Sequence, residues 1–436
     1  MITKGVKQAW GVIMKKLPCV LLIPTLGLVL LALIGPWPAA AQGSPFQSLF
    51  PRLATMPAPS WLRPGMRLSF YASAASLPGS RHYYWRDPQG NYVLKGDPQG
   101  DKFKRGDNPA PAGHGYLQLD VVARQGDLAV VSMLHWTMDA AGRNITPLAV
   151  QSFVCPVGDG NTFWLSPAVL RQIKPRRTPG LVIQSGSFRL KTGGSRPAAY
   201  FTTTSRQTRQ TWIFDRQTGV LLSSMVSASS RENIRIGATR PSPGQLSARR
   251  ALAQTTYLGM RGRRFPWQNA PPPAWLSTVK ELLYRGSSQT GVVGSPPMSR
   301  PIDFQARVVK RGPGWIHYQA VASSAGYGPM PPSRNITMQV SGAAQIGGLW
   351  LPPAGIARLR PGMLLDSDPT TGVKQWVLSL GPAGGAGRTL VIREQGQTHT
   401  TDYGYDVNRG VLVFFKNTIR NGLGFTGLNL RLVSMR

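Results

Sequence analysis

One seven-residue run occurs twice, as Asp215-Arg216-Gln217-Thr218-Gly219-Val220-Leu221 and as Asp406-Val407-Asn408-Arg409-Gly410-Val411-Leu412. A run of strand-forming residues precedes each Asp, and a second apolar run follows each Gly. Asp accepts hydrogen bonds from the backbone of a turn, and Gly adopts positive φ without steric cost. We therefore predict a hairpin in each half of the chain, with Asp215, Gly219, Asp406 and Gly410 as its turn residues.

The rest of the sequence repeats in the same order around these turns. Five further pairs match: Pro57–Leu62 with Pro271–Leu276, Gln118–Arg124 with Gln305–Arg311, Arg143–Thr146 with Arg334–Thr337, Trp164–Ala168 with Trp350–Ala354, and Tyr257–Arg261 with Leu432–Arg436. Each match is short, but an ordered series indicates internal duplication. The sequence predicts two tandem homologous domains, in which Trp164 and Trp350 are structural landmarks.

The landmarks also set the expected domain limits. We expect a first β domain at 57–261 and a second at 271–436, with linkers at 42–56 and 262–270. The second linker belongs to a joint rich in Arg and Pro, which is typical of a semi-rigid spacer. Unequal spacing places two insertions in the first copy, near 81–108 and 223–250.

Strand patterns dominate both copies. Tyr116–Ala123 alternates and is followed, after a short turn, by Leu128–Met133, which predicts a hairpin. Short helices are expected at Pro167–Ile173, Pro353–Leu359 and Leu276–Tyr284. With 49 Gly and 38 Pro, the chain is predicted to be mainly β and antiparallel.

The N-terminus has the three parts of a secretion signal. Lys4, Lys7, Lys15 and Lys16 precede an apolar run from Leu17 to Gly35, and an Ala-Ala-Ala site follows. We expect a signal peptide at 1–41, cleaved after Ala41, and export to the periplasm or surface of a bacterium. An uncleaved N-terminal anchor is the alternative, because roughly 20 apolar residues can span a bilayer.

The chain is strongly basic, with 50 Lys and Arg against 17 Asp and Glu and a net charge of +33. Such a surface attracts polyanions in a salt-dependent way. Lipopolysaccharide, anionic lipid and acidic polysaccharide are the expected partners, together with peripheral membrane contact, and nucleic acid is less favoured. A compositional bias towards Arg without a ligand is the other interpretation. Cys155 would be the only cysteine after cleavage, and we expect it to be a buried thiol rather than a mixed disulfide with a partner.

No catalytic set emerges from the residue spacing. The five His lack metal-binding spacing, and no G-x-S-x-G motif occurs. Leu364–Thr370 resembles the D-x-D-x-T nucleophile motif of haloacid-dehalogenase-type phosphatases, but it lies inside a β repeat, so a loop is expected there. We expect no metal, no cofactor and no enzymatic activity.

The first insertion is the most individual segment of the chain. Two Asp-Pro-Gln-Gly runs, ten residues apart, suggest an extra hairpin that mixes aromatic and cationic residues. Such residues could stack on sugar rings or bases and neutralise phosphates. The candidate ligand-binding residues are Arg81, Tyr83, Tyr84, Trp85, Arg86, Lys102, Lys104 and Arg105. A hairpin that merely covers a sheet edge is the alternative.

In each copy, strands and a W-L-x-P segment lead through an aromatic strand into Asp-x-x-x-Gly-Val-Leu. This order resembles periplasmic lipoprotein-carrier proteins of the LolA/LolB type and their uncharacterised relatives. The resemblance implies a curved sheet or half-barrel wrapped over short helices, an apolar cavity and a hydrophobic ligand.

These observations together predict an exported, non-enzymatic protein that binds an anionic or amphiphilic component of the cell envelope. The alternatives are a structural or assembly subunit of an envelope complex, and an envelope hydrolase. Charge for binding is expected from Arg176, Arg177, Arg249, Arg250, Arg263 and Arg264. If one copy has a specific role, the insertions point to the first.

Overall fold

The computed structural model describes residues 44–77, 81–86, 92–95, 111–139, 142–205, 208–234, 244–292, 294–324, 333–382, 388–422 and 424–436. The expected signal segment and its cleavage site lie outside these ranges. The described residues belong to one compact unit, Pro38–Arg436.

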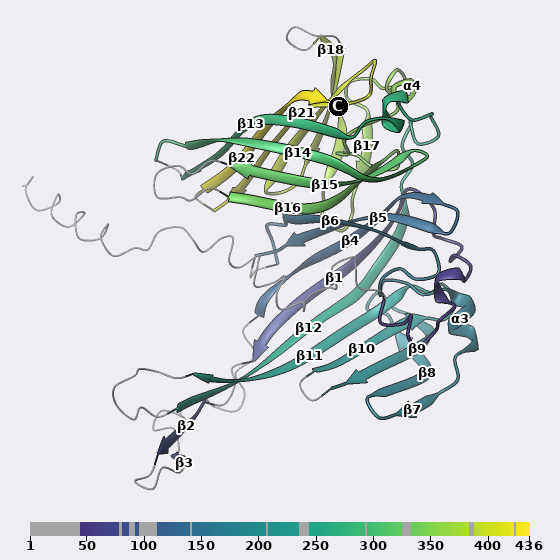
Figure 1. Ribbon diagram of the computed structural model, residues 1–436, viewed down its shortest axis with the longest axis vertical. Coiled ribbons are helices and arrows are strands. Elements are labelled where there is room, and N and C mark those ends of the chain that lie inside the picture. The colour runs from purple at the N-terminus through teal and green to yellow at the C-terminus, as the bar shows by residue number, and fades with distance from the viewer. Residues whose placement is uncertain are drawn as a thin grey trace, which may run out of the picture. The chain divides into compact units, whose positions relative to one another are not determined.

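The first copy forms an antiparallel sheet with ten strands in its main path (Figure 1). In spatial order they are β6 (Thr146–Pro156), β5 (Leu128–Thr137), β4 (Pro111–Gln125), β1 (Met66–Leu77), β12 (Gly244–Gly262), β11 (Leu221–Ile234), β10 (Thr208–Asp215), β9 (Ser195–Thr204), β8 (Leu181–Arg189) and β7 (Arg176–Thr178). The first strand therefore pairs with the last, which brings distant parts of the chain together in the middle of the sheet.

The second copy repeats this order strand for strand. Its sheet runs β16 (Ser333–Gly342), β15 (Trp315–Ser324), β14 (Met298–Gly312), β13 (Glu281–Val292), β22 (Gly424–Met435), β21 (Leu412–Asn421), β20 (His399–Asp406), β19 (Arg388–Gln395), β18 (Lys374–Pro382) and β17 (Leu364–Ser367). The mainly β, tandem architecture predicted from the sequence is confirmed.

The two sheets share irregularities as well as strand order. The pairing of β1 with β12 shifts register after Ser69, and that of β13 with β22 shifts after Leu283, the matching position. Bulges also occur at Val122 in β4 and at Val309 in β14. Because bulges interrupt a ladder at specific residues, their repetition supports a common origin for the copies.

The repeated sequence motifs lock together in each copy. Leu165 N donates to Gly219 O at 2.9 Å, and Leu351 N donates to Gly410 O at 2.8 Å. Asp215 and Asp406 cap their own turns by accepting backbone N–H groups of the following residues. The Asp-x-x-x-Gly turns and the W-L-x-P segments thus form a single structural joint, and the predicted turn role is confirmed.

The helices are short. α3 (Pro167–Gln172) and α4 (Pro353–Ile356) lie where helices were predicted. The helix expected at Leu276–Tyr284 is wrong, because Ala274–Ser277 forms one 3-10 turn and the chain then enters β13. The apolar residues in this stretch are spaced ambiguously, and pairing of β13 with β14 and β22 decides the conformation.

Both predicted insertions contain extra strand structure. β2 (Arg81–Arg86) pairs with β3 (Tyr92–Lys95) and with the start of β12, which confirms an additional hairpin. β11 and β12 are longer than β21 and β22, and their extension carries the contact with β2.

The two segments expected to be linkers are not solvent-exposed spacers. Phe46 and Leu53 are buried in the first copy, and Phe265 and Trp267 belong to the core of the second. In the second segment, the aromatic side chains outweigh the Pro and Arg content that suggested a spacer.

The two sheets are packed on each other. β16 lies against β4, β5 and β6. Val122, Ala123 and Val130 of the first copy form a buried cluster with Trp315 and Val340 of the second. The copies therefore share apolar core, and their contact is more than a flexible tether.

Replacing Gly410 by Ala should destabilise the protein by about 3 kcal/mol. Gly410 has φ +67°, and an added Cβ would lie 2.0 Å from Leu351 O. Gly314 is the control, because it has φ +76° but open space around it. Gly314→Ala should cost only about 1 kcal/mol. Urea unfolding of both variants tests this, and equal losses would contradict the proposed joint.

Candidate functional site

The residues predicted from the first insertion are placed only in part. Arg81, Tyr83, Tyr84, Trp85 and Arg86 all lie on β2, as its backbone shows. Lys102, Lys104 and Arg105 lie outside the described residues, as do the side chains of β2. Their role in ligand binding stays a prediction.

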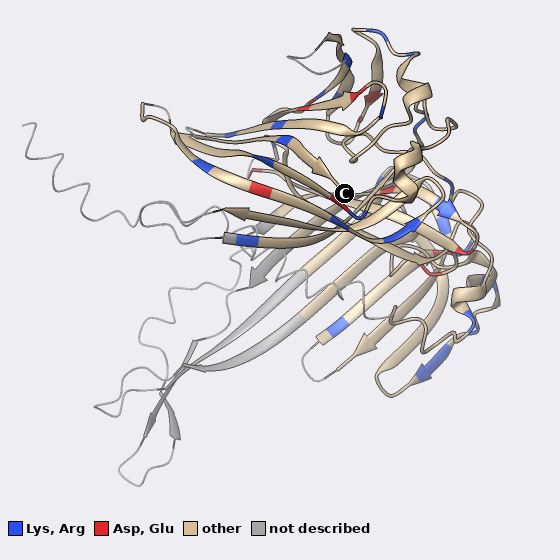
Figure 2. Ribbon diagram, turned by 45° about the horizontal axis from the view of Figure 1, so that its top comes forward, with Lys and Arg blue, Asp and Glu red and all other residues tan. Residues whose placement is uncertain are grey.

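The residues expected to supply surface charge differ in exposure. Arg176, Arg177 and Arg264 are exposed, whereas Arg263 is only 6% exposed and is not a surface cation. The side chains of Arg249 and Arg250 are not described. Figure 2 shows Lys and Arg at separate places on both sheets.

A cavity of about 350 Å³ lies on the inner side of the second sheet. Tyr284, Phe304, Tyr318, Tyr403 and Phe415 supply aromatic walls. Leu and Ile side chains of the same sheet supply most of the remaining apolar surface. The second copy thus supplies most of the cavity wall. The insertions had instead suggested a specific role for the first copy.

The first sheet closes one side of this cavity. Leu134 and Trp136 of β5 and Pro147, Ala149 and Val150 of β6 all line it. Val150 is 41% exposed, so the cavity meets solvent beside β6. Closure of the cavity therefore depends on the packing of the two copies.

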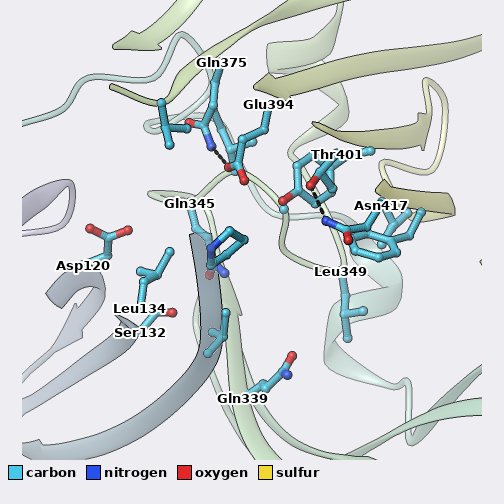
Figure 3. Close-up of a pocket in the computed structure, with 18 of the residues that line it drawn as sticks. Asp120, Ser132, Leu134, Gln339, Gln345, Leu349, Gln375, Glu394, Thr401 and Asn417 are labelled. Carbon is cyan, nitrogen blue, oxygen red and sulfur yellow. Dashed lines mark hydrogen bonds between the residues drawn. The ribbon is translucent and has the colours of Figure 1, made fainter. Parts of the chain in front are cut away.

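Four polar side chains, Gln375, Glu394, Thr401 and Asn417, form a row across β18, β19, β20 and β21 at one end of the cavity, whereas Asp120, Ser132 and Gln339 line other sides of it (Figure 3). Gln375 Nε2 donates to Glu394 Oε2 at 2.5 Å, and Asn417 Nδ2 donates to Thr401 Oγ1 at 2.8 Å. The Oε1 atoms of Gln345 and Gln375 are buried and have no hydrogen-bond partner among the described residues. Unpaired buried acceptors are costly unless a ligand or water donates to them.

An ion cluster lies beside the cavity, where the two sheets meet. It contains three arginines and three aspartates: Arg67, Arg261, Arg263, Asp120, Asp366 and Asp368. Arg67 donates to both carboxylate oxygens of Asp120, at 2.6 and 2.7 Å, and its third nitrogen donates to Asp368. Because Arg67 is on β1 and Asp368 follows β17, these bonds join the two copies.

The other two arginines complete the charge balance. Arg261 forms a bidentate pair with Asp366 at 2.8 and 3.0 Å, and Arg263 NH2 lies 2.9 Å from Asp120 Oδ2. Burial alone raises the pKa of Asp120, but the charges of Arg263 and Arg67 outweigh it and hold this pKa below its usual value. Asp120 therefore stays ionised although it is buried.

Asp368 is held in the same way. Burial raises its pKa, but Arg67, the Thr370 backbone N–H and Gln118 together lower it below the usual value. Gln118 donates to Asp368 Oδ2 at 2.6 Å and accepts the Trp136 indole N–H at 3.0 Å. The cluster thus also fixes Trp136, which lines the cavity.

The sequence interpretation missed this cluster. Asp366 and Asp368 were expected in a loop, yet β17 includes Asp366, and both carboxylates are buried. A signal was present, because Asp120 lies between apolar residues in an alternating strand and Arg67 lies between Met66 and Leu68. Charged residues at such positions are rarely fully buried unless they are paired.

At the position that matches the cavity of the second sheet, aromatic side chains pack closely against the first sheet. Trp212 occupies the position that corresponds to Tyr403, a wall of the cavity. The Phe46 ring lies 5.2 Å from Trp212, 5.2 Å from Phe201 and 5.3 Å from Phe214. The second copy has no equivalent of Phe46, because the chain at that distance before its first landmark is already β12.

The predicted burial of the Cys155 thiol is confirmed. His135 and His317 lie on β5 and β15, and Cys155 is a free, buried thiol near the end of β6. Burial raises the pKa of Cys155 well above its usual value, which makes it an inert thiol. Among the described residues, no group of His, Cys, Asp and Glu could hold a metal ion.

Asp368→Asn should lower the free energy of unfolding by about 3 kcal/mol, because Arg67 would keep its buried charge with one carboxylate fewer. The matched control is Asp303→Asn, since Asp303 pairs with Arg285 at 3.4 Å on the surface. That change should cost less than about 1 kcal/mol. Urea titrations at neutral pH compare the two, and equal small losses would show that the cluster does not hold the copies together.

Stability should fall as the pH is lowered from 6.5 to about 4. Burial lowers the pKa of His135 from 6.5 to about 4, so the unfolded chain binds a proton in this window while the folded chain does not. The expected loss is about 3 kcal/mol. Asp120 and Asp368, whose pKa values lie below 3.8, add their loss only at lower pH. In urea titrations at several pH values, His135→Gln should flatten the slope, and an unchanged slope would refute this assignment.

Comparisons with known proteins identify no family for this chain. No family model and no curated protein matches the sequence. Among solved structures, the chain is similar to a protein of unknown function from the DUF3598 family of Nostoc punctiforme. The identity is 12%, the alignment covers 82% of this chain and 96% of that chain, and the TM-score is 0.14. A likeness at this level supports no conclusion about function.

No helix among the described residues is both long and apolar enough to cross a membrane.

Proposed function

We propose that this protein is an exported binding protein, which holds the apolar part of an amphiphilic envelope molecule in the cavity of the second sheet. The cavity itself carries the proposal. Its volume of about 350 Å³ lies in the range typical of small-molecule sites, which are largely apolar with a few placed polar groups. The resemblance to lipoprotein carriers agrees with such a role.

The secretion signal predicted from the sequence supports export. The basic surface supports attraction of the protein to anionic components of the envelope. Without the four Lys of the predicted signal peptide, 46 Lys and Arg against 17 Asp and Glu leave a charge of +29, which favours salt-dependent attraction to anionic lipid or lipopolysaccharide. In this proposal the surface keeps the protein at the envelope, and the cavity holds the ligand.

Binding of a neutral single-chain amphiphile tests the proposal. The full chain should bind 1-decanol at one saturable site in titration calorimetry. Leu428→Trp, which fills the cavity from β22, should weaken this binding at least about tenfold, as expected when an apolar contact surface is lost. Val433→Trp is the control on the same strand, because Val433 is 52% exposed and does not line the cavity.

Saturable binding that only Leu428→Trp weakens would support a role for the cavity. Absence of saturable binding, or equal effects of the two variants, would overturn the proposal.

A further inference from the structure

One carboxylate on the cavity wall has no Lys or Arg partner among the described residues. In the ion cluster, three arginines balance three aspartates. Glu394 remains as a fourth carboxylate on the cavity wall, and its side chain is 15% exposed. Among the described residues, no Lys or Arg forms an ion pair with it. Among the described residues, Glu394 is therefore the one carboxylate of the cavity wall that no guanidinium balances, and His399 is its ion-pair partner.

The partners of Glu394 leave room for a further donor. Gln375 donates to Oε2, and His399 Nε2 lies 3.2 Å from Oε1. Each carboxylate oxygen can accept a second hydrogen bond. A ligand that donates to Glu394 would thus add to the existing contacts without displacing them.

The neighbouring amides favour the same kind of ligand. Because Gln375 uses its amide nitrogen to donate to Glu394, its oxygen is the atom left without a partner. Gln345 likewise presents a buried, unpaired Oε1. Gln375 and Glu394 lie side by side (Figure 3), Gln345 lines the same cavity, and the two unpaired oxygens require donors rather than acceptors.

Aromatic side chains line the cavity next to this end. Tyr403 and Phe415 have ring centroids 5.7 Å apart. Tyr403 pairs with Ile392, two residues before Glu394 on β19, so Tyr403 and Glu394 share the face of the sheet that lines the cavity. Aromatic rings beside a carboxylate favour a cation.

From these contacts we infer that the cavity selects an amphiphile whose head is a protonated amine. The inference rests on the proposed function, because it names the ligand class of the same site. The ammonium donates to Glu394 and to the free oxygens of Gln345 and Gln375, and the chain lies among the aromatic and aliphatic walls. Repulsion from Glu394 disfavours a carboxylate or phosphate head beside it.

Three probes with the same chain test the inference on the full-length protein: decylamine, 1-decanol and decanoate. Calorimetry at about 0.5 M salt suppresses binding to the basic surface, because screening then acts over a few ångström. Decylamine should bind at least about tenfold more tightly than 1-decanol, the gain expected from a charge-assisted hydrogen bond. Decanoate should bind most weakly.

Glu394→Gln keeps the shape and removes the charge. It should reduce the affinity for decylamine at least about tenfold and leave that for 1-decanol unchanged. Glu394→Asp keeps the charge and should retain the preference for the amine. Asp402→Asn is the matched control, because Asp402 pairs with Arg393 at 2.7 Å on the other face of the same strand pair. It should change none of the affinities.

The outcomes separate the two proposals. If neither 1-decanol nor decylamine binds, the proposed function fails. If 1-decanol binds but decylamine binds no better, or if Glu394→Gln leaves the preference intact, the amine inference is overturned while the binding function stands.

Discussion

The ion pairs from Arg67 to Asp120 and Asp368 are the constraint on which the rest of the structure depends. Removing charges from water costs several kcal/mol for each ion, and only close, fully hydrogen-bonded partners offset that cost. Arg67 is held by carboxylates from both sheets, and its bonds therefore require the two copies to meet in one arrangement. That arrangement also sets the wall formed by Trp136 against the cavity.

The second copy carries the same strand positions with reversed charge. Glu281 corresponds to Arg67 and Arg307 to Asp120, and this pair lies on the surface with Arg307 Nε 3.4 Å from Glu281 Oε2. An exposed pair contributes little to stability. The Arg67–Asp120 pair of the first copy thus helps to hold the copies together, whereas the matching Glu281–Arg307 pair of the second copy is solvated.

The bulges in β4 and β14 have diverged in a similar way. Val122 is 1% exposed because it packs against Trp315, whereas its counterpart Val309 is 64% exposed. Divergence also reaches the interior, where Phe46 packs among aromatic rings in the first sheet, whereas Met260, at the same distance before the second landmark, lies in β12.

Only the tertiary structure showed that the W-L-x-P segments bond to the Asp-x-x-x-Gly turns. The sequence by itself determined the duplication, the β class and the turn residues. These features depend on short-range chemistry, such as capping by Asp215 and the positive φ of Gly219, which a local pattern records. The tertiary structure alone decided that Arg67 meets Asp368, that residues near Trp267 are core, and that Glu394 faces a cavity. Each of these features depends on residues that are far apart in the chain. Burial and pairing determine whether a charged side chain is solvated or becomes part of a site, and no local pattern encodes them.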